Sequence, residues 1–323
     1  MLPQAFILLF ISCNSISTVH SKGYIEFPEE VKNVILSKEP KEYLSKSDLP
    51  SAFDWRNING RNFCSRTLNQ KNPSVCGSCW AEAATGALTD RYLIATNGVI
   101  QFQLSPQILL NFNRDITGGS CNGGSAHKAY DFIYNYGIAD DSCAPFNGMN
   151  WQWGFEVAAM KSPEDVRSHQ CRFCDWLNRC AFVPESFYNL YGVEEHGTVR
   201  GEAEMMAEIY ARGPIACSLN SDSPEFCSYK GGVMKIPESG NYTLTDHVVV
   251  IAGWGVDTVS GVPFWVGRNS YGTQWGEGAG GGWFRLERGK NAFGLETSKC
   301  AWAVPKAEDV KRIVNQYQTS LGL

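Results

Sequence analysis

The chain has 323 residues, of which 43% are hydrophobic, and its formal net charge at pH 7 is −5. This length is sufficient for one large domain or for two lobes with a proper core. The acidic balance, with no basic patch or stripe, argues against a nucleic-acid-binding function.

The N-terminal residues read as a secretory signal peptide. An apolar run from Leu2 to Ile11 is followed by mostly small or polar residues, so we expect a signal at residues 1–22. A membrane anchor is the alternative, but the run is far short of the roughly 20 residues needed to span a bilayer. No later segment is long and apolar enough to span one. We therefore expect no membrane span, and a lysosome-like compartment or the extracellular space as the destination.

Residues 23–48 are charged, contain proline and show no strong period, which favours a short, removable pro-segment. The compact domain is expected over residues 49–305, and residues 306–323 have the spacing of a docked surface helix. Helical spacing or helix start signals are found in four earlier segments. These expected helices are 80–97, one opening at Ser105-Pro106, 125–136 and 201–212.

Between the third and fourth of these helices, residues 139–182 are expected to form a long irregular surface excursion. After residue 213 the pattern changes to short apolar or aromatic runs divided by glycines, which predict strands. The expected strands are 215–219, 248–252, 263–266 and 283–286. An order in which the helices come first and the strands follow is typical of an α+β fold.

The cysteine content indicates an oxidising compartment, because the chain has twelve cysteines. Removing Cys13 with the signal and keeping Cys79 as a thiol leaves ten, which predicts five disulfides. A zinc site at Cys171, Cys174 and Cys180 is an alternative. No further Cys-x-x-Cys pair or nearby histidine supports it, so no metal or cofactor is expected.

Cys79 is the strongest candidate for a nucleophile. It stands at the start of an expected helix, whose positive end lowers a thiol pKa and favours the thiolate. A thiolate needs a base and a group that fixes the base. His247 begins an expected strand, and Asn269 follows it by 22 residues. The alternatives are that Cys79 is one more half-cystine and that His247 is structural.

The run Cys76–Trp80 (Cys-Gly-Ser-Cys-Trp) resembles the local signature of papain-like cysteine peptidases, which have a histidine and an asparagine downstream. The resemblance covers roughly residues 49–305. It implies a two-lobed α+β fold, with an N-terminal helical lobe, a C-terminal antiparallel β-barrel-like lobe and a cleft between them. It also implies that Cys79 and His247 form a thiolate–imidazolium pair oriented by Asn269.

Further site residues follow from the same resemblance. Gln70, with the Cys79 backbone N–H, would stabilise the oxyanion. Gly124 lies in a segment similar to the family's cleft loop and would pair with an extended substrate. Gly77 and Trp275 complete the expected substrate-binding set. The partners implied are peptide or protein substrates and cystatin-like inhibitors, with the enzyme a monomer.

The resemblance also implies the disulfides Cys76–Cys121 and Cys217–Cys300. Six other cysteines are left with open connectivity, and these are Cys64, Cys143, Cys171, Cys174, Cys180 and Cys227. Asn241 begins an Asn-x-Thr pattern and is a candidate for glycosylation.

The segment after Gln70 carries an insertion of about three residues, 71–73, which resembles a loop of the cathepsin X (cathepsin Z) branch. That branch removes single C-terminal residues, because its loop blocks the cleft and holds the substrate's carboxylate. The branch uses a histidine where this chain has Lys71, which can pair with a carboxylate as a compact charge. The alternatives are a solvated Lys71 in an endopeptidase, and an inactive binding protein on the same scaffold.

Two departures from the family are notable. Residues 23–48 contain no cysteine to cap Cys79, so latency must come from steric cover or is weak. Tyr271 stands where the family has tryptophan, next to the expected Asn269.

Overall fold

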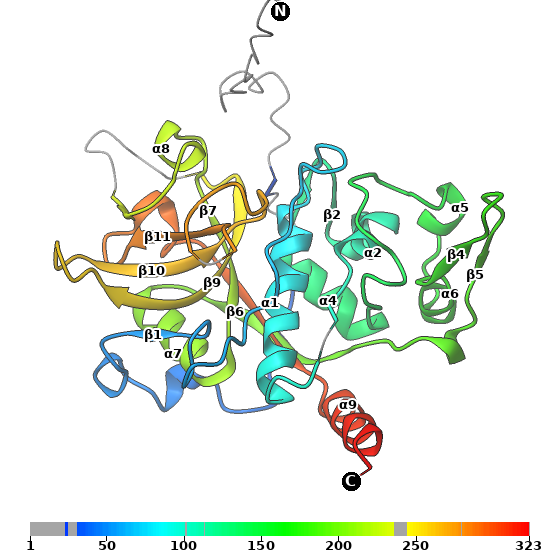
Figure 1. Cartoon of the computed structure of the whole chain (residues 1–323), viewed down its shortest axis with the longest axis horizontal. Coiled ribbons are helices and arrows are strands. Elements are labelled where there is room, and N and C mark those ends of the chain that lie inside the picture. The colour runs from blue at the N-terminus through cyan, green and yellow to red at the C-terminus, as the bar shows by residue number, and fades with distance from the viewer. Residues whose placement is uncertain are drawn as a thin grey trace, which may run out of the picture.

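In the computed structural model, helix α1 (Cys79–Ala95) runs through the middle of the molecule, between a mainly helical lobe and a sheet lobe (Figure 1). Every residue from Cys79 to Tyr92 is buried. Helix α1 is covered by helices on one side and by the sheet on the other. Small residues such as Ala83, Ala84 and Ala87 allow this close approach.

The structure describes residues 23–24, 31–100, 102–112, 114–235, 244–278 and 280–322. The expected signal peptide and Asn241 lie outside these ranges. No helix in the described ranges combines the length and the apolar character that crossing a membrane requires.

The helical lobe contains most of the remaining helices, and the serines expected to begin two of them act as N-caps. Ser105 accepts from the Ile108 N–H, and Ser125 accepts from the Lys128 N–H, so both predicted starts are confirmed. The helices of this lobe are α2 (Pro106–Asn111), α3 (Arg114–Thr117), α4 (Ala126–Tyr136), α5 (Phe155–Ala158) and α6 (Pro163–Ser168). The others are α7 (Glu202–Arg212), α8 (Pro224–Cys227) and α9 (Ala307–Ser320).

In the described part of the chain, the main sheet has eight strands, seven of them in the order β6-β12-β7-β9-β10-β11-β8, with β1 added against β9. The pairs are antiparallel except β8 with β11, and the order is open, so the expected barrel-like lobe is an unclosed sheet. The strands are β1 (Phe53–Asp54), β6 (Val193–Val199), β7 (Ile215–Leu219), β8 (Val233–Met234), β9 (His247–Val256), β10 (Pro263–Arg268), β11 (Trp283–Glu287) and β12 (Cys300–Pro305).

The sheet separates two hydrophobic cores, as the side chains of β9 show. Val248 and Val250 pack with α1 and the helical lobe, whereas Val249 and Ile251 pack on the opposite side with residues of α7. This alternation is the period of a strand buried on both faces. Helices around one lobe and an antiparallel sheet in the other confirm the predicted α+β class. His247 is the first residue of β9, so the sheet fixes its place beside α1.

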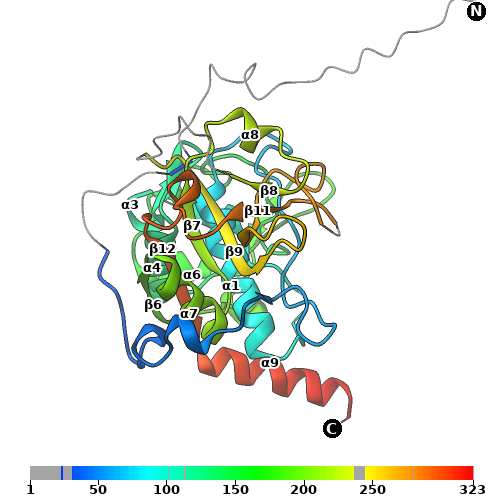
Figure 2. The ribbon, with the colours of Figure 1, turned by 90° about the vertical axis from the view of Figure 1, so that its left-hand side faces the viewer.

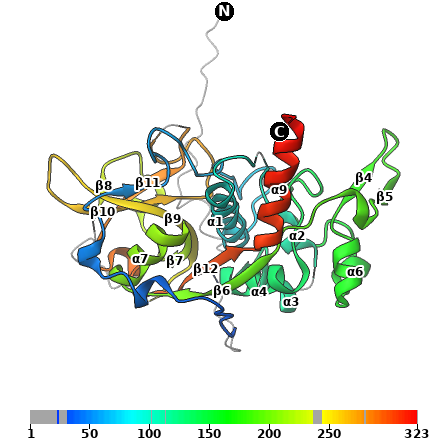
Figure 3. The ribbon, with the colours of Figure 1, turned by 90° about the horizontal axis from the view of Figure 1, so that it is seen from below.

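The excursion between α4 and β6 is more ordered than the sequence indicates. It contains α5, α6 and a hairpin of β4 (Arg172–Cys174) with β5 (Cys180–Phe182), which forms the outermost part of the helical lobe (Figures 1 and 3). A second small sheet pairs β2 (Gly119–Ser120) with β3 (Gly123–Gly124). Strands β6 and β12 were not predicted.

Four disulfides join described cysteines. They are Cys76–Cys121, Cys143–Cys171, Cys174–Cys180 and Cys217–Cys300. The cysteines of the alternative zinc site are thus all bonded in disulfides. Cys227 is also disulfide-bonded. The prediction that all ten of these cysteines pair is wrong at Cys64, which is a buried thiol packed against Ala252, Val266 and Trp283.

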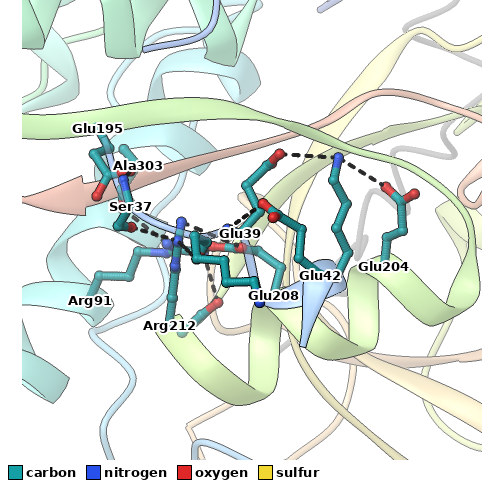
Figure 4. Close-up of polar contacts among 12 residues, drawn as sticks. Ser37, Glu39, Glu42, Arg91, Glu195, Glu204, Glu208, Arg212 and Ala303 are labelled. Carbon is teal, nitrogen blue, oxygen red and sulfur yellow. Dashed lines mark hydrogen bonds and ion pairs between the residues drawn. The ribbon is translucent and has the colours of Figure 1, made fainter. Parts of the chain in front are cut away.

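The described residues 31–48 lie along the sheet lobe beside α7 (Figure 2). Val34 pairs antiparallel with His196 of β6, and Arg212 of α7 donates to the Ser37 hydroxyl and the Lys38 carbonyl (Figure 4). At the other end of the chain, α9 lies against the lower end of α1 (Figures 1 and 3). There Asp309 accepts a hydrogen bond from the Tyr92 hydroxyl.

Candidate active site

Cys79 and His247 are brought together by the first turn of α1 and the first residue of β9. The Cys79 side chain is fully buried, and its Sγ accepts a hydrogen bond from the Val248 N–H at 3.4 Å. Because Val248 follows His247 directly, the sulfur lies next to the backbone of His247 at the start of β9. The two expected groups of the reaction, 168 residues apart in the chain, thus share one site.

Asn269 fixes the imidazole of His247. The Oδ1 of Asn269 lies 2.7 Å from the Nε2 of His247 and also accepts from the Ser270 N–H at 2.7 Å. An atom that accepts a backbone N–H must be the amide oxygen, so Nε2 of His247 carries the hydrogen and donates it. The Nδ1 atom is then the proton acceptor of the neutral ring.

The described residues 23–24 lie over Cys79. The Gly124 N–H donates to the Gly23 carbonyl at 3.2 Å, the Tyr24 N–H donates to the Asp246 carbonyl at 3.0 Å, and Tyr24 forms a parallel bridge with Gly124. A Cβ built on Gly23 would stand only 2.4 Å from the Cys79 Sγ. The chain's own N-terminal part therefore covers the sulfur, as the steric-cover expectation requires.

Burial under this cover determines the charge state of the site. Burial raises the pKa of the Cys79 thiol to about 12, although the Val248 N–H opposes the rise. Burial also lowers the pKa of His247, while the hydrogen bond to Asn269 and the charge of Asp246 raise it and the charge of Lys71 lowers it. Both shifts favour the neutral thiol and the neutral imidazole. The lowered thiol pKa expected from the helix start is thus wrong for the covered site, because water is excluded from it.

Gln70 is held rigidly next to this pair. Its Nε2 donates to the Cys76 carbonyl at 3.0 Å, and its Oε1 accepts from the Ser270 hydroxyl at 2.7 Å. One hydrogen of the amide group remains free of these two bonds. Gly77, also expected in the site, is buried and donates its N–H to the Cys121 carbonyl at 2.7 Å.

Lys71 is an exposed residue whose ammonium lies over an aromatic ring of the site. Its Nζ is 3.8 Å from the centroid of the Tyr271 ring, and that ring is 5.0 Å from the His247 ring. Burial lowers the pKa of Lys71. Within the described ranges, no carboxylate forms an ion pair with Lys71, so its positive charge is available to a ligand.

Trp275 is placed behind Tyr271. It is buried, its indole N–H donates to the Phe226 and Cys227 carbonyls, and its ring lies 5.9 Å from that of Tyr271. Trp275 therefore supports the Tyr271 ring from behind, and its own side chain is not exposed to a substrate.

Sequence reasoning did not identify Gly23, Glu82 or Ser270 as site residues. Gly23 is placed by long-range docking, which no local pattern records. Glu82 has the spacing of an ordinary helical residue, and only its position one turn after Cys79 could have drawn attention to it. Among the described residues, no group of three or more His, Cys, Asp or Glu side chains could hold a metal ion.

A model of the papain family of cysteine proteases matches residues 49–303 of this chain. The chain therefore belongs to the papain family of cysteine proteases, and it is a cysteine peptidase by family.

Two curated relatives extend this assignment. A protein of Onchocerca volvulus named cathepsin Z is 36% identical over 281 residues, which cover 83% of each chain. A gut-specific cysteine proteinase of Caenorhabditis elegans is 30% identical over 258 residues, which cover 79% of this chain and 74% of the relative. The predicted similarity to the cathepsin Z branch is confirmed.

Solved structures agree on the fold. Procathepsin L2 from the larval midgut of Tenebrio molitor has a TM-score of 0.68 at 23% identity, covering 91% of this chain and 81% of that one. A structure from a study of the mite allergens Blo t 1 and Der p 1 has a TM-score of 0.60 at 26% identity, covering 79% and 71%.

Proposed function

We propose that this protein is a carboxypeptidase that removes single residues from the C-termini of peptides and proteins, with Cys79 as its nucleophile. The observation that carries the specificity is the Lys71 ammonium, which lies 3.8 Å over the Tyr271 ring with no ion-pair partner among the described residues. A substrate whose chain ends beside the site supplies a carboxylate to this charge. An internal peptide bond has none there.

The loop that carries Lys71 is held on both sides. The Lys71 N–H donates to the Asn69 Oδ1 at 3.0 Å, and the Ser74 hydroxyl donates to the Gly148 carbonyl at 2.9 Å. The loop is therefore tied to the excursion of the helical lobe, and the backbone that carries Lys71 has a defined position. Such pre-organisation lets a charge select its ligand without a large ordering cost.

The chemistry follows from the site once the N-terminal segment has left. Water then reaches Cys79 and His247, and the thiol proton passes to the imidazole Nδ1. The sulfur attacks the carbonyl carbon of the last peptide bond, while the Gln70 amide and the Cys79 N–H donate to the oxyanion. Such donors supply about 2.7–4 kcal/mol each.

Collapse of the tetrahedral intermediate releases the C-terminal amino acid, which takes the proton from His247. Water then hydrolyses the thioester and restores the thiol. The disulfides favour an oxidising compartment, so we place the enzyme in the secretory route, at a lysosome-like or extracellular site. We expect it to act as a monomer and to bind cystatin-like inhibitors.

The test compares one peptide as its free acid and as its C-terminal amide. For Lys71→Ala, kcat/KM on the free acid should fall by about 10–100-fold, the worth of a hydrogen bond between charged groups, with a small change on the amide. Lys161→Ala, at an exposed lysine of the excursion, is the matched control and should change neither. Equal losses on both substrates, or internal cuts in a peptide library, would contradict the proposal.

A further inference from the structure

Glu82 is a buried carboxyl group for which the proposed reaction has no use. It lies on α1, one turn after Cys79, and only 3% of its surface is exposed. The Ser78 hydroxyl donates to its Oε1 at 3.2 Å, whereas its Oε2 has no hydrogen-bond partner among the described residues. A buried carboxyl oxygen without a partner is unfavourable, so Oε2 calls for a ligand.

Asn269 also carries a buried polar atom that has no hydrogen-bond partner among the described residues. Its Oδ1 is occupied by His247 and the Ser270 N–H, but its Nδ2 is buried and has no partner in the described part of the chain. An amide donor left without an acceptor is as unfavourable as the carboxyl oxygen of Glu82.

Glu82 and Asn269 line one small cavity between α1, β9 and the end of β10. Its volume is about 10 Å³, close to the space that a single water molecule requires. Ser270 lines it as well, and Gly86 and Val249 form part of its apolar wall. A cavity of this size, lined by two residues that each carry a buried polar atom without a partner among the described residues, fits one buried water molecule.

We propose that Glu82 is a positioning residue of the active site: its Oε2 and the Nδ2 of Asn269 hold a shared water molecule, which keeps the Asn269 amide turned with Oδ1 toward His247. The inference rests on the proposed cysteine-peptidase chemistry but not on its preference for C-termini.

The orientation of this amide decides which tautomer His247 adopts. With Oδ1 facing the ring, Nε2 carries the hydrogen and Nδ1 is free to accept the proton of Cys79. A flipped amide places Nδ2 against Nε2, which then has to accept a hydrogen bond. The hydrogen moves to Nδ1, and the imidazole loses its function as base. The Ser270 N–H resists this flip from one side of the amide, and the water resists it from the other.

The shared water molecule can connect Glu82 to Asn269 whether or not Glu82 is ionised. Burial raises the pKa of the Glu82 carboxyl to about 8, so the group is neutral at acidic and neutral pH. A protonated Oε2 donates to the water, an ionised one accepts from it, and in both states the water accepts from Asn269. Arg66 and Arg268 also line the cavity, and Asp141 lies with Glu82 and Arg66 on a larger cavity next to it.

Two variants of the processed enzyme test the proposal. Glu82→Gln keeps an acceptor for Ser78 and a donor for the water, so it should retain kcat and the rate at which iodoacetamide alkylates Cys79 at pH 5. Glu82→Met has a similar shape but no polar atom for the water. It should lower both quantities about tenfold, with KM unchanged. A folded Glu82→Met enzyme with wild-type rates, or equal losses in both variants, would overturn the inference.

A high-resolution crystal structure of the processed wild type provides a second test that does not depend on how the variants fold. It should show one solvent peak within hydrogen-bonding distance of both the Glu82 carboxyl and the Asn269 amide, and an empty cavity rejects the proposal. Alkylation reports on the Cys79–His247 couple alone. If the enzyme is not a carboxypeptidase, the alkylation rate of Cys79 still tests the role of Glu82. A failure of the carboxypeptidase proposal can therefore be distinguished from a failure of the Glu82 proposal.

Discussion

Gly23 lies directly against Cys79, so close that a Cβ atom at position 23 would be 2.4 Å from the sulfur. The backbone around Gly23 is held by Gly124 on one lobe and by Asp246 on the other. Distances under 3.0 Å are outside the range of real Cβ contacts, so a larger residue requires the segment or the sulfur to move. A glycine at this point lets the chain cover its own nucleophile without a covalent cap.

Gly23→Ala is expected to weaken the cover in the unprocessed protein. The added methyl group pushes residues 23–24 away from Cys79, water enters, and the burial that raises the thiol pKa is relieved. The rate of Cys79 alkylation by iodoacetamide in the unprocessed chain should rise by about tenfold or more. An enzyme produced without the expected pro-segment, residues 23–48, should be unaffected.

Lys32→Ala is the matched control, because Lys32 is an exposed residue of the same segment. It should leave the alkylation rate of the unprocessed chain unchanged. A Gly23→Ala protein as slow to react as the wild type would show that the cover does not depend on this contact.

Lys71 should also set the pH range of the reaction. Burial and the positive charge of Lys71 both lower the pKa of His247, while Asn269 and Asp246 raise it. The reactive couple needs a protonated imidazole, so activity falls when pH rises through the pKa of His247. Lys71→Met removes the opposing charge, and the alkaline limb of the pH–rate profile on a C-terminal amide should move to higher pH.

Lys71→Arg keeps the charge and is expected to keep the wild-type alkaline limb on the amide substrate. When the substrate is the free acid, its carboxylate neutralises the charge of Lys71. The alkaline limb of the wild-type pH–rate profile should therefore lie at higher pH on the free acid than on the amide. Identical limbs for the methionine and arginine variants would contradict an electrostatic effect of Lys71 on His247.

The sequence predicted the parts of the fold that local signals determine. Serines that cap helices and glycines that end them located α2, α4 and α7, and apolar runs located β7, β9, β10 and β11. Strand β6 was missed because its sequence, Val-Glu-Glu-His-Gly-Thr-Val, is largely polar, as an edge strand permits. Strand β12 is a short run that ends in proline, and its partners are far away in the chain.

The candidate active site could be predicted where a sequence motif indicates it, but not where tertiary packing creates it. Cys79, His247 and Asn269 were identified from their neighbours in the sequence. The cover by Gly23 depends on contacts with both lobes, and no spacing records such contacts. The proposed role of Glu82 depends on α1 being buried on all sides from Cys79 to Tyr92, and helical spacing in the sequence does not reveal such burial.

Arg91 should be a major contributor to the stability of the junction between the lobes. It lies on α1, 1% of its side chain is exposed, and it forms a 3.0 Å ion pair with the equally buried Glu208 of α7 (Figure 4). It also donates to the Pro214, Gly213 and Ala303 carbonyls, the last of these on β12.

Arg91→Met leaves Glu208 buried with only Arg212, 3.9 Å away, as a counter-charge. Removing one partner of a buried pair costs about 3–5 kcal/mol, which urea unfolding with intact disulfides would measure. Lys306→Met, in the exposed Lys306–Glu308 pair, is the control and should cost about 0–1 kcal/mol. If Arg91→Met costs no more than this control, the junction does not depend on the ion pair. If replacing Glu208 by leucine as well recovers part of the loss, the cause is the uncompensated carboxylate rather than the missing guanidinium contacts.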